Sequence, residues 1–432
     1  MEVLTILALI IALFALLASG VWIGLALIGV GWLAMELFTG REVGSAMAIT
    51  IWGTSSAWTL TALPLFIWMG EILFRSRLSK DMFSGLAPWL EFLPGRLLHT
   101  QIVGCTIFAA VSGSSAATCA TIGKMSLPEL KRRGYPDHVA IGTLAGAGTL
   151  GLLIPPSIIM IVYGVTANVS IAKLFIGGVL PGIVLALLFM GYIVFWAIFH
   201  KDQVPSPLRK YRFMERIAAS RSLIPVVLLI GGVLVTIYTG IATATEAAAI
   251  GVVGSLLLTA SQRMLSWRVF LDGVLGAVRL YCMIALILTG AAFLTLAMGY
   301  MGLPRQLAEW IGSLGLSNFS LILALLVFYI ILGCFLDGVS VIVLTMGVIL
   351  PTVQLAGIDL VWFGIFLTLT VEMSQITPPV GFNLFVLQGM TGKQILWIAR
   401  AALPMFFLLV TAVLLVYFIP GLVTWLPMHM KG

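Results

Sequence analysis

The chain has 432 residues, of which 61% are hydrophobic and 9% are charged, and its formal net charge is +7. A soluble protein of this length could not bury so much apolar surface, so a water-soluble globular fold is excluded. The basic residues lie between apolar runs, which indicates membrane orientation and not nucleic-acid binding. The composition therefore predicts an all-α polytopic membrane protein.

Ten apolar stretches are long enough to cross the roughly 30 Å hydrocarbon core of a bilayer. They cover residues 3–18, 22–38, 58–74, 139–165, 174–199, 222–239, 243–261, 273–298, 360–387 and 400–418. The first two form a scaffold region, 1–57, which begins without the basic segment and cleavage site of a signal peptide. Two further apolar stretches, 98–128 and 321–351, do not fit as simple spans.

The positions of Lys and Arg indicate how those two stretches enter the membrane. If both crossed it, the basic clusters would fall on opposite faces. If both are re-entrant helical hairpins, all Lys and Arg residues lie on one face except Arg41, Lys173, Arg305 and Lys431. We expect the basic face to be cytoplasmic, with the first hairpin open to the cytoplasm, the second open to the outside, and both termini outside.

Four prolines recur at one offset, which indicates an internal duplication. The pairs, each 223 residues apart, are Pro128 and Pro351, Pro155 and Pro378, Pro156 and Pro379, and Pro181 and Pro404. We place the first repeat at 58–199 and the second at 281–418, with a linker and scaffold helices at 200–280 and a tail at 419–432. Because the hairpins open to opposite faces, the repeats are related by inverted topology.

Two segments of the first repeat interrupt its helical pattern. Residues Ser112–Ser115 lie in the middle of the first hairpin stretch and suit its tip. The segment Pro155–Ser157 breaks the 139–165 span, because each proline lacks a backbone donor and frees a carbonyl one turn earlier. Unpaired backbone groups are tolerated in a bilayer only inside protein or around a polar cavity, so we expect both breaks to line a central site.

The region between the repeats contributes a basic segment and a carboxylate. Pro205 and Pro207 interrupt the segment 201–221, which we expect to be a cytoplasmic linker with an interfacial helix, the alternative being a regulatory or lipid-binding arm. Glu246 follows in the 243–261 span. A carboxylate inside an apolar region costs on the order of 3 kcal/mol or more unless it is paired, so Glu246 is either a coupling group or a structural hydrogen-bond acceptor.

The second repeat has breaks at the matching positions. Its hairpin tip is predicted at Asp337–Ser340, where Asp337 aligns with Ser114 and Gly338 with Ser115, and its broken span contains Thr377–Pro379. Asp337 is the acid that we favour as a Na⁺ or substrate ligand. Glu372, close to the diproline, has the same two interpretations as Glu246, and proton coupling through these acids stays open.

An intramembrane enzyme is not expected. The four cysteines form no CxxC pair, and the sequence has no HExxH motif, nucleophile elbow or phosphate-binding loop. We therefore predict no cofactor and no metal other than Na⁺. The paired breaks also argue against a purely structural scaffold, which would gain nothing from unsatisfied backbone.

Seven segments resemble the large membrane subunit (DctM type) of tripartite ATP-independent periplasmic (TRAP) transporters, over essentially the whole chain. They are PLFIWMGEIL, SGSSAATCATIG, GTLGLLIPPSIIMIVYG, KLFIGGVLPG, TATEAAAIG, LDGVSVIVLTMGVILPTV and ITPPVGFNLFVL. Two positions depart from the family pattern. The usual TPTEA segment has alanine at Ala244, and the polar residues flanking Glu372 differ.

The resemblance implies an elevator-type, Na⁺-coupled importer of an organic anion, such as a C4-dicarboxylate, sialic acid or keto acid, in the bacterial inner membrane. It also implies two partners, a small DctQ-type membrane subunit on a separate chain and a periplasmic DctP-type solute-binding protein. The alternative is a stand-alone carrier similar to divalent-anion/Na⁺ symporters.

The resemblance assigns functional residues to the tips and breaks. Substrate contacts would come from Ser114, Ser115, Ser157, Asp337, Gly338 and Thr377. Sodium contacts would come from Ser112, Gly113, Ser114, Thr149, Pro155, Asp337, Ser340, Thr345, Thr377 and Pro378. Structural or coupling roles would fall to Glu246, Glu372, Pro156 and Pro379.

Overall fold

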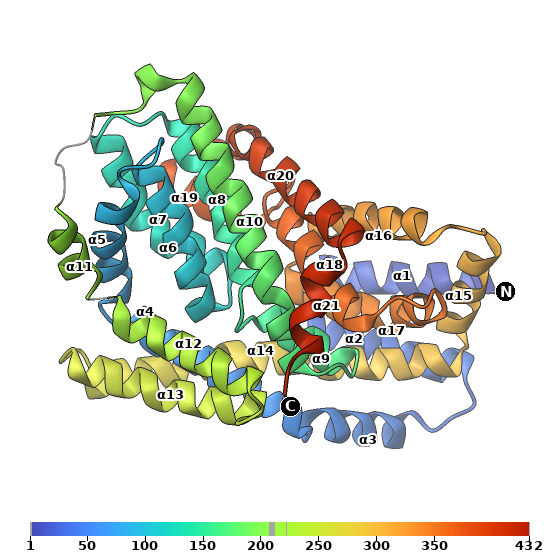
Figure 1. Ribbon diagram of the computed structural model, residues 1–432. Coiled ribbons are helices and arrows are strands. Elements are labelled where there is room, and N and C mark those ends of the chain that lie inside the picture. Colours follow the sequence, from blue (N-terminus) through green and yellow to red (C-terminus); the bar gives the residue numbers. More distant parts are fainter. Residues whose placement is uncertain (1, 207–211, 222, 432) are drawn as a thin grey trace.

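The computed structural model describes residues 2–206, 212–221 and 223–431, and this part of the chain is all helical (Figure 1). The first half contains α1 (Glu2–Ala18), α2 (Ile23–Phe38), α3 (Val43–Ser55), η1 (Trp58–Thr61), α4 (Ala62–Phe74), α5 (Leu78–Leu90), α6 (Leu97–Ser112), α7 (Ser115–Arg132), α8 (Asp137–Leu153), α9 (Ile158–Thr166), α10 (Ile171–Phe199) and η2 (Lys201–Gln203). The second half contains α11 (Phe213–Ser220), α12 (Ile224–Tyr238), α13 (Ala244–Ser261), α14 (Trp267–Tyr300), α15 (Leu303–Ser313), α16 (Asn318–Gly333), α17 (Gly338–Leu355), α18 (Leu360–Gln375), α19 (Phe382–Thr391), α20 (Ile395–Phe418) and α21 (Gly421–Met428). The prediction of an all-α polytopic membrane protein is confirmed.

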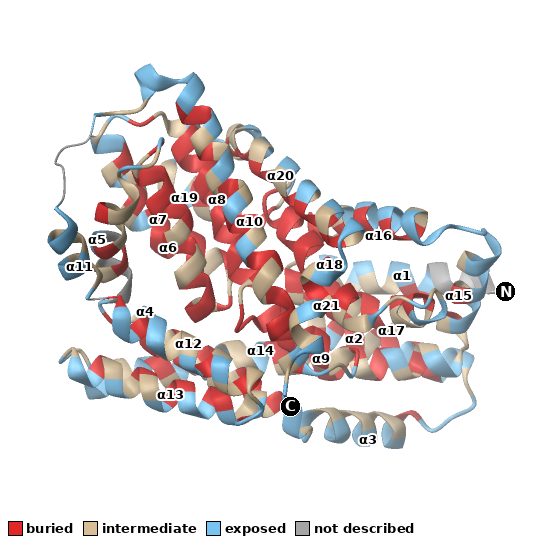
Figure 2. Ribbon diagram, in the orientation of Figure 1, coloured by how far each residue is buried: buried red, intermediate tan, exposed pale blue. Residues whose placement is uncertain are grey.

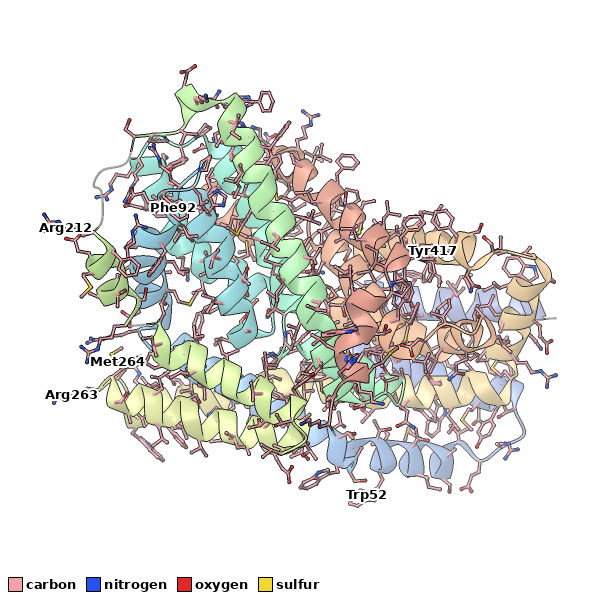
Figure 3. All side chains as sticks on the ribbon, in the orientation of Figure 1. Trp52, Phe92, Arg212, Arg263, Met264 and Tyr417 are labelled. Carbon is pink, nitrogen blue, oxygen red and sulfur yellow. The ribbon has the colours of Figure 1, made fainter. Side chains whose placement is uncertain are left out.

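Five described helices are long and apolar enough to cross a membrane, or up to eight if each bent pair forms one span. Shorter apolar helices, among them α2 and α18, account for further predicted spans. Exposed aromatic side chains such as Trp52 point outward from α3, as Figure 3 shows, and Trp52 is 75% exposed. An apolar surface of this kind suits contact with lipid and not with water.

Helix bounds recur at the same 223-residue offset as the prolines. α7 begins at Ser115 and α17 at Gly338 (338 − 115 = 223), and their last residues, Arg132 and Leu355, differ by the same number. The correspondence also covers α8 with α18, α9 with α19 and α10 with α20. It also includes the N-terminal helices. α1 corresponds to α12, α2 corresponds to α13, and α3 together with α4 corresponds to α14. The two halves differ there, since α3 and the segment Trp58–Phe74 meet at a bend of 51° while α14 is continuous.

The first hairpin consists of α6 and α7, which pack against each other. α6 ends at Ser112, and Gly113 has a φ of 58°, a left-handed conformation that favours glycine. The Ser114 hydroxyl accepts a hydrogen bond from the Ala117 amide at 3.4 Å and begins α7. The predicted tip at Ser112–Ser115 is confirmed.

The second hairpin differs from the prediction in the position of its tip. α16 ends at Gly333 and α17 begins at Gly338, so the turn is formed by Cys334–Asp337, while Gly338 and Ser340 lie in the first turn of α17. The reason is helix capping, because the Asp337 carboxylate accepts hydrogen bonds from the Val339 and Ser340 amides at 3.1 and 3.2 Å. The arms also separate, since α16 packs chiefly on α18 and α17 chiefly on α15.

The two diproline segments interrupt the two most deeply buried helices. α8 is buried from Val139 to Leu153 and α18 from Trp362 to Gln375. α8 meets α9 at a bend of 42° across Ile154–Ser157, and α18 is separated from α19 by residues 376–381. Figure 2 shows buried residues concentrated in α6, α8 and α10, with exposed residues on the outer sides of α3, α12 and α13. The first break therefore lies inside protein, as unpaired backbone requires, whereas the second is only partly buried.

Several basic helix ends lie together at one end of the molecule. Lys393, after α19, is 3.0 Å from the carboxylate of Asp137 at the start of α8. The Arg77 amide, after α4, donates to the side chain of Gln262, after α13, at 3.2 Å. Figure 3 shows Arg212, before α11, and Arg263, after α13, at the left of the view. This grouping agrees with the predicted common face, although which face is cytoplasmic stays a prediction.

Candidate functional site

The two hairpin tips and the helix ends that flank the two breaks meet in one cavity of about 210 Å³. Its polar lining comes from both tips and from the end of α18, and the middle of α14 closes it with apolar side chains. The lining residues are Gly113, Ser114, Ser115, Ala116, Leu152, Ile158, Ile159, Leu280, Met283, Ile284, Asp337, Gly338, Val339, Gln375 and Phe382. Five predicted site residues, Gly113, Ser114, Ser115, Asp337 and Gly338, are thus brought together.

Small residues allow the first tip to approach the first broken helix. A Cβ on Gly113 would lie 3.1 Å from the carbonyl oxygen of Pro156. A Cβ on Gly151 would lie 2.7 Å from the Thr118 hydroxyl and in steric conflict with the carbonyl oxygen of Ser114. Ser112 strengthens the tip, because its hydroxyl and that of Thr118 are 2.7 Å apart. The tip is therefore held in a defined position against α8.

Ser114 and Asp337 occupy equivalent positions, each as the N-cap residue of the second arm of its hairpin. The Asp337 carboxylate accepts hydrogen bonds from two backbone amides and from the Ser340 hydroxyl. A helix N-terminus attracts negative charge, and Asp337 neutralises this effect at α17. Ser114 is neutral, so the positive end of α7 stays available to an anion in the cavity.

A hydrogen bond links the halves across the cavity. The Ser115 hydroxyl donates to the side-chain oxygen of Gln375 at 3.4 Å. The Gln375 amide nitrogen is buried and has no hydrogen-bond partner in the described part of the chain. Gln375 was not among the predicted residues. The available signal was its position, as a polar residue three places before Pro378 in an otherwise apolar run.

Glu372 is fully buried and meets its counterpart in the other half. The Thr149 hydroxyl donates to one Glu372 oxygen at 3.4 Å, and the two residues are 223 positions apart. The other oxygen, Oε1, has no partner among the described residues. One turn away on α8, the Ala145 carbonyl accepts from the Asn383 amide at 3.2 Å, and Oδ1 of the fully buried Asn383 is also unpartnered there. A buried carboxylate with an unpartnered oxygen favours a nearby cation or a proton.

The remaining predicted residues do not line the cavity. Ser157 begins α9, where its hydroxyl accepts from the Met160 amide at 3.4 Å and donates to the Leu152 carbonyl. The Thr377 hydroxyl donates to the Met373 carbonyl at 2.7 Å. The Thr345 hydroxyl is 2.9 Å from that of Tyr329, between the arms of the second hairpin. Pro155 and Pro156 are buried in the first break, whereas Pro378 is half-buried and Pro379 exposed in the second.

Glu246 does not lie inside an apolar region, and that expectation was wrong. It is exposed in the first turn of α13, where its carboxylate accepts from the Thr243 amide and hydroxyl, both at 2.8 Å. The Thr243 hydroxyl in turn accepts from the Glu246 amide at 3.3 Å. This reciprocal arrangement is a capping box, which the spacing Thr-x-x-Glu would have predicted.

The chemistry of the site suits a small anion next to a cation. Backbone amides and hydroxyls at the first tip suit a carboxylate or another oxyanion, and the carboxylates of Asp337 and Glu372 suit a hard cation such as Na⁺. Among the described residues, no set of three His, Cys, Asp or Glu side chains could hold a metal ion. A sodium site would therefore use hydroxyls and freed backbone carbonyls in addition to these acids.

Comparisons with known proteins point to one family. The family model described as "Tripartite ATP-independent periplasmic transporter, DctM component" matches residues 10–422. The chain is 33% identical over 405 residues to the C4-dicarboxylate TRAP transporter large permease protein DctM of Pseudomonas aeruginosa, covering 92% of each chain. It is 31% identical over 425 residues to the isethionate TRAP transporter permease protein DctMQ of Oleidesulfovibrio alaskensis, covering 98% of this chain and 65% of that one.

A solved structure has the same fold. The YdaH transporter of Alcanivorax borkumensis superposes with a TM-score of 0.68, covering 94% of this chain and 98% of the other, at 12% sequence identity. At this identity the likeness concerns the fold alone.

Proposed function

The chain belongs to the DctM family of tripartite ATP-independent periplasmic transporter components, and from this premise we propose that it is the large membrane subunit of a Na⁺-coupled importer of small organic anions. The observation that supports this best is the meeting of both hairpin tips with the helix ends that flank both breaks, in one cavity. Transport sites of this kind lie where two repeats meet and where broken helices present their ends.

The anion binds at the first tip in this proposal. Ser114 leaves the N-terminus of α7 without a neutralising charge, and the hydroxyl of Ser115 also lines the cavity. Relatives are named for a C4-dicarboxylate and for isethionate, which are both small organic anions. We infer a small carboxylate or sulfonate as the solute class.

The cation binds on the side of the second half. Asp337 is half-buried beside the cavity and would repel an anion at Ser114 unless a cation neutralised it. Glu372, buried with one unpartnered oxygen, has the same requirement. Binding of Na⁺ would thus favour binding of the anion, which is the coupling that a symporter needs.

Movement follows an elevator mechanism in this proposal. The face of α14 toward the cavity is apolar, formed by Leu280, Met283 and Ile284. Because these three side chains are apolar, the hairpins and broken helices could slide along this face without breaking hydrogen bonds to them. The hairpins with α8, α9, α18 and α19 are therefore the moving part, and α14 with its neighbours α2 and α4 is the scaffold.

We infer two partners and a location from the family. A separate DctQ-type subunit would enlarge the scaffold, and a periplasmic DctP-type protein would deliver the solute to the inner membrane. The longer relative named DctMQ is compatible with the first partner. Both termini of this chain would be periplasmic.

Uptake by proteoliposomes that contain the chain and its small subunit tests the proposal. A radiolabelled C4-dicarboxylate and isethionate are the probes, each with its cognate solute-binding protein outside. We expect uptake under an inward Na⁺ gradient and none under an equal K⁺ gradient. Equal uptake under both gradients would contradict Na⁺ coupling, and full uptake without the binding protein would favour the stand-alone carrier.

A further inference from the structure

A second cavity of about 770 Å³ lies at the basic end of the molecule. It is an open cavity lined by α7, the start of α8 and the end of α19. Its charged lining residues are Lys124, Lys131, Lys393 and Asp137. No residue that we assign to transport lines it, so the cavity is distinct from the proposed transport site.

Two of the three lysines have no compensating charge. Lys393 lies 3.0 Å from the Asp137 carboxylate and 5.0 Å from the ring centroid of Trp397, so it is already paired. Lys124 and Lys131 are exposed and project from one side of α7, because seven residues are two helical turns. Neither forms an ion pair or hydrogen bond in the part of the chain that the structure describes. The cavity therefore has an excess of two positive charges.

Neighbouring arginines show that the excess is specific to the cavity. Arg132 and Arg133 contact the Glu129 carboxylate at 2.7 and 2.8 Å, and Arg133 also contacts Glu91 at 3.3 Å. The hydrogen bond from Arg132, together with that from Arg133, lowers the pKa of Glu129 and keeps its charge at neutral pH. The arginines at this helix end are thus paired and point elsewhere, whereas the unpaired lysines line the cavity.

The cavity has an apolar floor beneath its basic rim. Leu127, Ile141 and Met390 contribute to the lining. Gly123 closes the floor, because a Cβ there would lie 2.8 Å from Met390 Cε and 2.8 Å from a Leu144 methyl carbon. A basic rim above apolar side chains at a membrane surface suits a phosphate group, whether free or attached to acyl chains.

We propose that this cavity binds a phosphate-bearing anion through Lys124 and Lys131, with Lys393 held beside them by Asp137. The phosphate comes either from an anionic phospholipid head group or from free inorganic phosphate. The bound group ties the base of the first hairpin to α8 and to α19 of the second half. Occupancy therefore stabilises the part of the molecule that carries the Ser114 tip.

Thermal unfolding of the purified full chain tests this proposal at constant ionic strength. One arm titrates inorganic phosphate against chloride in uncharged detergent. The other arm compares phosphatidylcholine nanodiscs with increasing fractions of phosphatidylglycerol. The variant is Lys124→Gln with Lys131→Gln, and the matched control is Lys201→Gln with Arg263→Gln, two exposed basic residues outside the cavity.

A saturable rise in the melting temperature is expected in one arm, and that arm identifies the source of the phosphate. The double variant Lys124→Gln with Lys131→Gln should weaken the apparent affinity for phosphate about tenfold or more, while the control variant leaves it unchanged. The proposal would be overturned if neither arm gave a saturable rise in melting temperature. It would also be overturned if the variant and the control lost apparent affinity to the same extent. If the double variant does not fold, Lys124→Gln alone against Lys201→Gln gives the same comparison.

Discussion

Asp337 has a charge at a position where its counterpart in the other half, Ser114, has none. Both residues begin a helix at the same cavity, so capping alone does not explain the difference. A carboxylate beside an anion site is unfavourable without a cation. At the residue scale, this asymmetry is the main reason to assign the anion to the first tip and the cation to the second.

Replacement of Asp337 by Asn separates the charge from the cap, because Asn is an equally good N-cap residue. We expect Asp337→Asn to fold and to lose most Na⁺-driven uptake, by about tenfold or more, because a loss of about 1.4 kcal/mol in cation binding lowers the affinity tenfold. The control is Asp359→Asn at the exposed N-cap of α18, where the carboxylate accepts from the Trp362 amide at 2.8 Å. Uptake by Asp337→Asn equal to that of the control would disprove the assignment.

Substitutions at Glu246 test whether this residue only caps α13 and takes no part in coupling. Gln can take the place of Glu in a capping box, so Glu246→Gln should change the stability by no more than about 0.5 kcal/mol and leave uptake unchanged. Thr243→Ala removes the cap and should cost about 1 kcal/mol in a thermal unfolding experiment. Strong loss of uptake in a stable Glu246→Gln protein would return this residue to the coupling machinery.

Sequence patterns predict which residues contribute polar groups to the site better than they predict which of these residues contact one another. Ser114, Asp337 and the prolines were recognisable because polar or helix-breaking residues stood in apolar runs at matching positions. Glu246 was misplaced because hydropathy treats a helix end and a helix interior alike. Gln375 was missed because its bond to Ser115 joins residues 260 positions apart, which no local pattern encodes.

At the scale of helices and hairpins, the first tip depends on a close approach to α8. Gly151→Ala would place a methyl group against Ser114 and Thr118, so we expect about 1–3 kcal/mol of destabilisation and reduced uptake. Gly191→Ala, in α10 with open space around it, is the control and should retain both stability and uptake. Melting temperature and initial uptake rate measure the two effects, and equal behaviour of the variants would show that the approach is unimportant.

The opposite directions of the hairpins can be tested at their matching ends. Arg132 and Leu355 are exposed last residues of α7 and α17, 223 positions apart. In a Cys282→Ser background, which removes the exposed native thiol, Leu355→Cys should react with a membrane-impermeant maleimide in intact cells. Arg132→Cys should react only after permeabilisation. Labelling of both from the same side would exclude inverted topology.

Element boundaries were predictable where polar caps and prolines mark them. The first tip was placed correctly, and the second was shifted because Asp337 is the last residue before its helix and not the first residue of the turn. Short helices such as α5 and α15 were not predicted, because neither is long and apolar enough to be recognised as a span. Their equivalent places in the two halves become visible only once the helix bounds are known.

At the scale of the whole molecule, the 223-residue offset relates nearly every helix in one half to a helix in the other. The matching contact between Thr149 and Glu372 places equivalent residues of the two halves against each other in the interior. If the hairpins open to opposite faces, as we predict, a site between the two halves is reached from both faces, which is what alternating access requires. The central claim is that a cation bound beside Asp337 is linked to the transport site.

Thermal stability of the purified chain with its small subunit, in Na⁺ against K⁺ at equal ionic strength, tests that claim most directly. A ligand that binds only the folded state raises its stability in a saturable way. The account predicts a saturable rise in melting temperature with Na⁺ that Asp337→Asn abolishes and Asp359→Asn retains. An equal melting temperature in the two cations, in the presence of substrate and binding protein, would contradict it.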